Sequence, residues 1–125
     1  MDKKVHDFDF LKKGGPYSHI IEANGFYFVS GMTPIDIEKG ITITDDVRKG
    51  TELALSNIKR ALEHIGSGMD KIVKATVYLR DMADFNVMNE VYKTFFPVNP
   101  PARTCIAVRG IPGNSPVEIE VIALK

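Results

Sequence analysis

The first regular pattern along the chain is a pair of short extended segments. Residues 19–22 and 26–30 are rich in β-branched and aromatic side chains, and Ala23-Asn24-Gly25 separates them. Asn-Gly is the dipeptide that best tolerates the positive φ angles of a tight turn between antiparallel strands. The pattern therefore predicts a β-hairpin.

A helical pattern follows between Val47 and Ile65. Asp45 and Asp46 precede its first turn, where the helix dipole favours negative charge, and Gly66 follows its last turn. The apolar positions of its stripe lie three or four residues apart, and they are Leu55, Ile58, Leu62 and Ile65. We expect an amphipathic helix.

Strict alternation then returns between Ile72 and Leu79, which predicts a strand with one covered face. The residues expected on the covered face are Val73, Ala75, Val77 and Leu79, and those expected on the other face are Lys74, Thr76 and Tyr78.

A second helix is expected after this strand, with Asp84 as its capping residue. Its apolar stripe consists of Phe85, Met88, Tyr92 and Phe95. Pro97 prevents its continuation, because proline has no N–H and its ring clashes with the preceding turn.

Two final strands are predicted at residues 104–108 and 117–124, joined by the turn-rich segment 110–116. The order ββαβαββ predicts a single α+β domain over residues 1–125, with both helices on one face of a mixed sheet. The opposite face would be half apolar, which suggests self-association, because it carries Thr76, Tyr78, Glu118, Glu120 and Ile122.

Composition and charge narrow the possible functions. The 125 residues are 44% hydrophobic and 26% charged, as in a folded domain, and 16 basic residues balance 16 acidic ones. This balance lacks the excess of positive charge that nucleic-acid binding requires. No apolar stretch is long enough to span a membrane, and the charged N-terminal segment is unlike a signal peptide, so we expect a cytoplasmic protein. A single cysteine and three scattered histidines predict no metal site.

Arg103 is the strongest candidate for a ligand-binding residue. It follows Pro100-Pro101-Ala102 at the entry to a predicted strand, where rigid prolines would hold the guanidinium base still. A guanidinium can donate two parallel hydrogen bonds to a carboxylate. An ion pair with Glu118 or Glu120 is an equally good interpretation of this spacing.

Other candidates could complete a site around Arg103. Alternation places Cys105 on the same face as Arg103, and it places Glu118 and Glu120 on one face of the neighbouring predicted strand, so these residues could share a cleft. A carboxylate there could hold water as a general base, although strand glutamates are commonly only solvated. We reject thiol catalysis, because no positioned histidine would activate Cys105.

Tyr17, Ser30, Gly31 and Asn89 are weaker candidates. Tyr17 lies in the turn Gly14-Gly15-Pro16-Tyr17-Ser18, where its hydroxyl could bind a ligand or pin the N-terminal segment. Ser30-Gly31 ends a strand and could expose backbone groups or form a bulge. Asn89 lies at the edge of the second helix's stripe, where its amide could reach a cleft or face water.

Together these signals resemble the RidA family, also called the YjgF family, of reactive-intermediate deaminases. The resemblance spans nearly the whole chain, and its most specific motifs are the last two. The matching segments are Gly15-Pro16-Tyr17-Ser18, Ser30-Gly31, Asn57-Ile58, residues 73–77, residues 81–85, Asn89, Val91-Tyr92, Phe95-Phe96, residues 101–105 (Pro-Ala-Arg-Thr-Cys) and residues 117–120 (Val-Glu-Ile-Glu).

The resemblance implies a chorismate-mutase-like fold assembled as a homotrimer, with ligand clefts between subunits. It implies a hydrolase of the 2-iminobutanoate/2-iminopropanoate deaminase type, which converts 2-imino acids or their enamines to 2-oxo acids and ammonia without a cofactor. Such enzymes remove intermediates released by pyridoxal-phosphate-dependent dehydratases.

The family also implies roles for individual residues. Arg103 would bind the substrate carboxylate, and Glu118 with the main chain near Cys105 would hold the attacking water. The remaining cleft-lining residues would be Tyr17, Ser30, Gly31 and Asn89.

The chain departs from the family pattern at His19 and Met32, where glutamine is common. Met32 would favour an apolar ligand side chain if it touches the cleft. Two other functions are compatible with the sequence: non-catalytic binding of small carboxylates in the clefts, and ribonuclease or translation-inhibitor activity, which the neutral charge balance disfavours.

Overall fold

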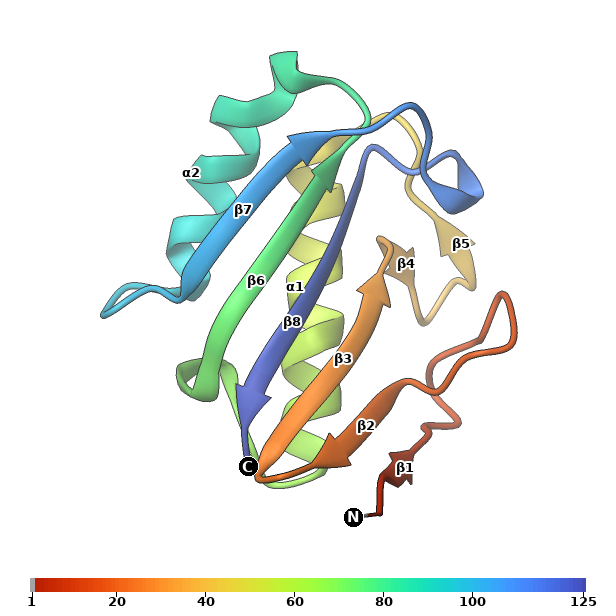
Figure 1. Cartoon of the computed structure of the whole chain (residues 1–125). Coiled ribbons are helices and arrows are strands. Elements are labelled where there is room, and N and C mark those ends of the chain that lie inside the picture. The colour runs from red at the N-terminus through yellow and green to blue at the C-terminus, as the bar shows by residue number, and fades with distance from the viewer. Residues whose placement is uncertain (1) are drawn as a thin grey trace.

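The computed structural model describes residues 2–125 and consists of one sheet covered on one face by two helices (Figure 1). The sheet has the strand order β1-β2-β3-β8-β6-β7. Its strands are β1 (Lys4–His6), β2 (Ile20–Ala23), β3 (Phe26–Met32), β6 (Ile72–Leu79), β7 (Ala102–Ala107) and β8 (Val117–Leu124). The helices are α1 (Val47–His64) and α2 (Phe85–Phe95). A separate small hairpin joins β4 (Ile35–Asp36) to β5 (Ile41–Thr42). The α+β fold and all seven predicted major elements are confirmed.

The β2–β3 hairpin forms through the predicted turn. Asn24 and Gly25 adopt φ angles of 55° and 81°, and Ala23 pairs with Phe26 across them. Positive φ at two central residues matches the twist of the two strands, which explains the Asn-Gly pair.

The two helices begin differently. The Asp46 side chain accepts a hydrogen bond of 3.0 Å from the Lys49 amide and caps α1, as expected of an aspartate at this position. Asp84 precedes α2 but its side chain forms no capping bond, so that part of the prediction is wrong. Asp81 instead caps a short 3-10 turn, residues 82–84, by accepting from the Ala83 amide, and this turn leads into α2.

The last two strands are not neighbours, contrary to the sequence-based expectation. β7 pairs in parallel with β6 because α2 forms the crossover between them. β8 runs antiparallel to both β3 and β6 and lies between them. One strand therefore separates Arg103 on β7 from Glu118 on β8.

Strand β6 begins with an irregularity that the alternation does not reveal. Ile72 pairs with Ala123 and Lys74 with Ile122, so one residue is inserted opposite β8. The insertion turns Ile72 inward and leaves Val73 39% exposed, which corrects the prediction that Val73 faces the core.

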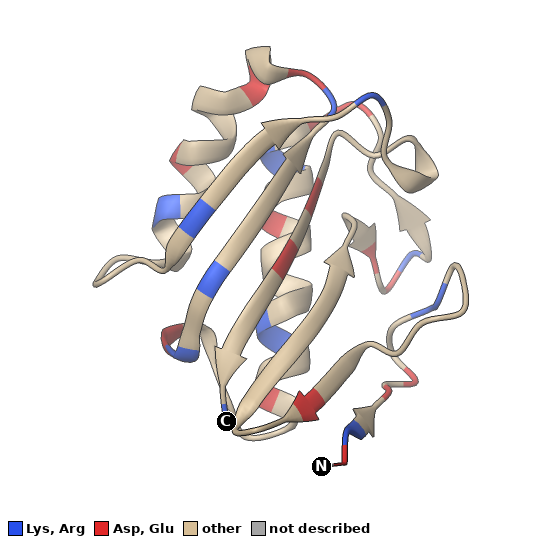
Figure 2. Cartoon of the chain, in the orientation of Figure 1, with Lys and Arg blue, Asp and Glu red and all other residues tan. Residues whose placement is uncertain are grey.

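The core lies between the sheet and the helices, where Leu55, Ile58, Val77 and Ile119 are fully buried. The opposite face of the sheet is open and mixes polar side chains with the exposed apolar residues Phe28, Ile106 and Leu124. Charged residues of both signs are scattered over the elements in view, without a single basic patch (Figure 2). Neither helix of the described chain is long and apolar enough to cross a membrane.

Candidate functional site

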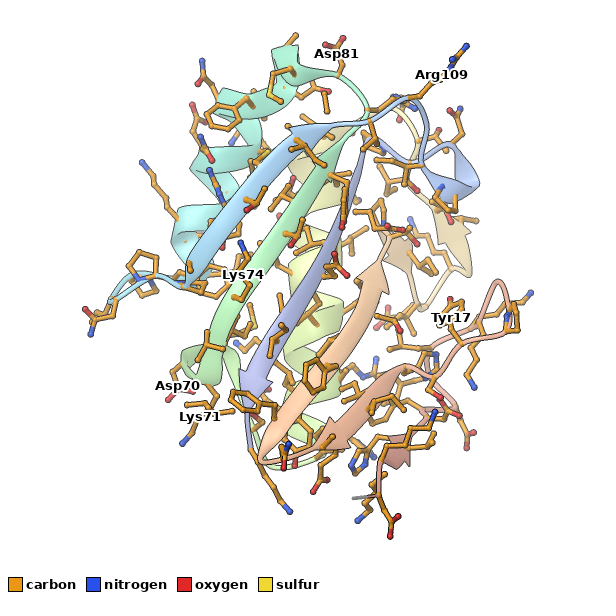
Figure 3. All side chains as sticks on the ribbon, viewed as in Figure 1. Tyr17, Asp70, Lys71, Lys74, Asp81 and Arg109 are labelled. Carbon is orange, nitrogen blue, oxygen red and sulfur yellow. The ribbon has the colours of Figure 1, made fainter. Side chains whose placement is uncertain are left out.

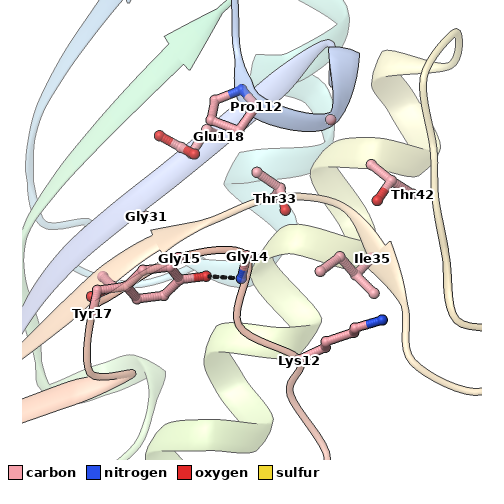
Figure 4. A pocket seen from close by; sticks show the side chains of 12 residues that line it. Lys12, Gly14, Gly15, Tyr17, Gly31, Thr33, Ile35, Thr42, Pro112 and Glu118 are labelled. Atoms are coloured by element: carbon pink, nitrogen blue, oxygen red, sulfur yellow. Dashed lines mark hydrogen bonds between the residues drawn. The ribbon is translucent and has the colours of Figure 1, made fainter.

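A cavity of about 470 Å³ opens beside the end of β3, between the segment before β2 and the turn before β8 (Figure 4). Candidate residues predicted from the sequence form part of its wall: Tyr17, Ser30, Gly31 and Glu118. Other lining residues were missed, namely Lys12, Gly14, Gly15, Thr33, Ile35, Thr42, Pro112 and Gly113. The β4–β5 hairpin is too short to show a period, so no sequence signal pointed to Ile35 or Thr42.

Gly31 makes room for the Glu118 carboxyl group. A Cβ atom on residue 31 would lie only 2.8 Å from Cδ of Glu118 and 2.9 Å from Oε2. The pairing of β3 with β8 shifts between Val29 and Met32, and this irregularity brings Gly31 against β8. The small residue thus fixes where the carboxyl group can lie.

The protonation of Glu118 is tuned by its surroundings. Burial raises the pKa of Glu118 above its ordinary value, and the nearby Glu120 charge raises it further. Glu120 is itself engaged, because it accepts a hydrogen bond from the Tyr78 hydroxyl, which raises the pKa of Tyr78 to about 12. A raised pKa makes the Glu118 carboxylate a stronger proton acceptor than an exposed glutamate.

Hydrogen bonds hold in place the part of the cavity wall that contains Tyr17. The Tyr17 hydroxyl accepts a hydrogen bond of 3.2 Å from the Gly14 amide (Figure 4). Ser30 donates through Oγ to the Ser18 carbonyl at 2.6 Å and through its amide to the His19 carbonyl at 3.0 Å. The segment before β2 is thus fastened to β3.

Arg103 lies elsewhere, against α2. Its Nη1 donates a hydrogen bond of 2.7 Å to Oδ1 of Asn89. Its guanidinium carbon lies 4.8 Å from the centre of the Tyr92 ring, a cation–π contact that holds the group against the helix. No ion pair of residues 2–125 includes Arg103, so the alternative of an internal pair with Glu118 or Glu120 does not form.

Arg103 and Glu118 occupy opposite faces of the sheet in one chain. Arg103 pairs with the buried Ala75, which faces the helices, whereas Glu118 pairs with Tyr78, which faces the open side. Tyr17 lies near the edge of the sheet formed by β1 and β2, which is opposite the edge formed by β7 (Figure 3). The expected cleft shared by these residues is therefore not formed within one chain.

Cys105 shares the helix-covered face with Arg103, as predicted. It pairs with Val77 and is half-buried. Burial raises the pKa of the Cys105 thiol, which keeps it protonated and agrees with the rejection of thiol catalysis.

The two positions that depart from the family pattern both lie inside the protein. Met32 and His19 are buried, and neither lines the larger cavity. Both line a smaller cavity, which shares Tyr17, Ser30 and Gly31 with the larger one. Among residues 2–125, no group of His, Cys, Asp and Glu side chains is arranged to hold a metal ion.

The sequence model of the family described as endoribonuclease L-PSP matches residues 10–125. The chain belongs to this family. It is 42% identical over 111 residues to a RutC family protein of Pyrococcus abyssi, covering 89% of this chain and 87% of the relative. It is 37% identical over 111 residues to the mouse protein named 2-iminobutanoate/2-iminopropanoate deaminase, covering 89% and 82% of the two chains.

One solved structure is similar to this L-PSP family member over nearly its whole length. The structure of TdcF from E. coli with bound serine is 32% identical, covers 98% of each chain and superposes with a TM-score of 0.90. The resemblance to the RidA family is confirmed by the chloroplastic Reactive Intermediate Deaminase A of Arabidopsis thaliana, to which the chain is 39% identical over 109 residues, covering 87% of this chain and 58% of the relative.

Proposed function

We propose that this protein hydrolyses 2-imino acids such as 2-iminobutanoate and 2-iminopropanoate to 2-oxo acids and ammonia. The observation that carries the proposal is the pair of half-sites: a guanidinium without a carboxylate partner on β7, and a half-buried carboxyl group beside Gly31 in the cavity. The name of the mouse relative and the serine bound to TdcF support a small carboxylate-bearing substrate.

The two half-sites require a second copy of the chain. We propose a homotrimer in which β7 of one subunit closes the cavity of the next, so that Arg103 faces Glu118 across the interface. The open sheet face supports assembly, because its exposed Phe28, Ile106 and Leu124 would be covered.

In this cleft, Arg103 would bind the substrate carboxylate with two hydrogen bonds, while Asn89 holds the guanidinium in place. Glu118, with the main chain near Cys105, would hold a water against the imine carbon. The carboxylate takes a proton from the attacking water as the C–O bond forms and passes it to the imine nitrogen, which gives a carbinolamine. It then takes the proton of the new hydroxyl group and passes it to the nitrogen as the C=O bond forms and the C–N bond breaks. The products are the 2-oxo acid and ammonia, and water is the only co-reactant.

The protein needs mainly to position the imine and the water, because imines already hydrolyse in water without a catalyst. Holding the water and the imine in a reactive geometry can contribute several kcal/mol. The reaction uses no group beyond the side chains and backbone of the protein.

The test is a coupled assay in which an amino-acid oxidase or a dehydratase generates the imine. We expect the wild-type protein to accelerate 2-oxo acid release. Absence of acceleration over the uncatalysed rate for all precursors would rule out the proposed activity. Tight 2-oxo acid binding without acceleration would instead indicate a binding protein, because equal stabilisation of ground and transition states leaves the chemical step unchanged.

Arg103→Ala tests the proposed carboxylate contact in the same assay. We expect kcat/KM to fall about 100-fold, because about two charge-assisted hydrogen bonds are lost. Arg48→Ala is the matched control, since Arg48 is exposed on α1 and pairs only with Glu90. Equal activity of the two variants would remove Arg103 from the site.

A further inference from the structure

Residues 9–18 form a loop whose two ends are fastened together at His19. The Phe8 amide donates a hydrogen bond of 2.9 Å to Nδ1 of His19, and the His19 amide donates one of 2.9 Å to Oδ1 of Asp7. The rings of Phe8 and His19 stack with their centres 5.7 Å apart. The loop carries Lys12 and Tyr17 in the cavity wall, so these contacts close the loop at its base.

The hydrogen bond to Phe8 determines the state of the imidazole. Nδ1 must carry a lone pair to accept from an amide, so His19 is neutral and its proton lies on Nε2. The side chain is 6% exposed, and burial lowers the pKa of His19 below its usual value, an effect that Asp7 opposes. The neutral form is therefore favoured by both contact and burial.

Nε2 is the nitrogen that carries the proton in this tautomer. It is buried and has no hydrogen-bond partner among residues 2–125. His19 also lines a small cavity of about 20 Å³, together with Leu11, Ser30 and Gly31. This volume admits one water molecule, which can accept from Nε2–H.

The backbone of His19 connects the loop to the floor of the larger cavity. Its carbonyl accepts from the Ser30 amide at 3.0 Å, and the Tyr17 ring lies 6.5 Å from the imidazole. Ser30 and Tyr17 both line the larger cavity. A displacement of His19 would therefore move both of these residues.

We propose that His19 is a positioning residue of the imine-hydrolysing site, which holds the Tyr17 loop in place while neutral and releases it when protonated. This proposal rests on the proposed function. A proton on Nδ1 would face the Phe8 amide, so two donors would oppose each other and the bond would be lost. Oδ1 of Asp7, 3.8 Å from Nδ1, would become the new partner.

The charged and titratable groups around His19 are few. The segment before β2 contributes Asp7, Lys12, Lys13 and Tyr17, and Lys13 is paired with Asp7. Strand β3 contributes the uncharged Ser30 and Met32. Helix α1 contributes His64, which contacts the Phe8 ring.

The direction of the pH effect follows from these states. Above a pH of about 6.5 the imidazole is neutral whether the loop is fastened or released. As the pH falls below that value, the released state takes up the proton first, because its imidazole is not buried. The fastened loop is therefore lost toward acid pH.

The first test compares the wild type with His19→Gln and His19→Phe between pH 5 and 8. Glutamine can still accept from the Phe8 amide but does not titrate. We expect the ratio of wild-type to His19→Gln kcat/KM to be at least about threefold lower at pH 5 than at pH 8. The titration of Glu118 cancels in this ratio, and His19→Phe should be impaired at every pH. A constant ratio would overturn the proposal.

The second test needs neither activity nor a variant. Nitrogen chemical shifts of His19 in the wild-type protein should report the Nε2–H tautomer at pH 8, and the Phe8 amide should lose protection from hydrogen exchange toward pH 5. A proton on Nδ1 at pH 8, or unchanged Phe8 protection, would refute the fastening role. An inactive protein that passes this test would disprove the deaminase function and leave the loop contact intact.

Discussion

Glu118 owes its place in the cavity to the missing side chain at residue 31. The contact involves the flexible end of a glutamate, so a methyl group at this position can be accommodated by moving the carboxyl group. Residue 31 therefore controls the geometry of the candidate site more than the stability of the fold.

We expect Gly31→Ala to lower kcat for imine hydrolysis about 10-fold while changing the melting temperature little, because a small displacement of the water-holding carboxyl group is costly for the reaction. Gly110→Ala is the control, since a Cβ there would meet nothing within 4 Å. Unchanged kcat in Gly31→Ala would show that the position of Glu118 does not limit the reaction.

Single residues were predictable from the sequence where local chemistry or a motif marked them. The proline-flanked Arg103 and the motif around Glu118 could be named as candidates, but their location on opposite faces depends on the registers in which β7 and β8 pair with β6. Lys12 and Thr42 could not be predicted from the sequence. They reach the cavity through the loop before β2 and the short β4–β5 hairpin, and neither segment shows a periodic pattern.

At the scale of elements, α1 illustrates how one side chain sets a boundary. Asp46 accepts from the Lys49 amide, whereas Asp45 is exposed and forms no such bond in the described chain. The two neighbouring aspartates have the same charge but different contacts.

Asp46→Ala should lower the free energy of unfolding by about 1 kcal/mol, because an amide at the start of α1 loses its partner. Asp45→Ala should change it by much less. Urea denaturation measures both, and equal losses would mean that only the charge near the helix dipole matters.

Strand β2, which lies between β1 and β3, is tied to the C-terminus through Glu22. Its carboxylate pairs with Lys125 at 2.7 Å and with His6 at 2.9 Å, and these contacts lower the pKa of Glu22 to about 2. A lowered pKa means that the contribution of Glu22 is present above its ordinary value of 4.5 and is lost as the pH falls toward 2.

Glu22→Gln should therefore be less stable than the wild type at pH 7, with a difference that shrinks between pH 4.5 and about 2. Urea denaturation over this range gives the measurement. Glu38→Gln serves as control, because Glu38 forms no ion pair among residues 2–125. A difference that does not depend on pH would contradict the role of the charge.

Long periodic segments made most elements predictable, and short or irregular ones escaped. Three residues in β1 and two in β4 cannot display a period. The bulge at Val73 exists only in relation to β8, so alternation within β6 gave no sign of it. The order of the strands likewise depends on which strands pair with each other, and no local sequence pattern specifies this pairing.

At the scale of the whole molecule, the proposed site exists only between copies. This arrangement can be tested by mixing two inactive variants, Arg103→Ala and Glu118→Gln, and allowing their subunits to exchange. In an equal mixture about one cleft in four receives both native residues, so we expect about one quarter of wild-type activity.

Sedimentation should accompany this experiment and give about 42 kDa, three times the chain mass of 13.9 kDa. A mixture no more active than its two components would place Arg103 and Glu118 in the same subunit or outside the site. A monomeric mass would exclude the proposed trimer.

In the proposed trimer, the separation of Arg103 from Glu118 across the sheet would also make the reaction rate depend on protein concentration. A lone chain, newly synthesised or highly diluted, would carry both halves of the machinery and be inert. Specific activity should therefore fall on dilution at the same protein concentration at which the oligomer dissociates.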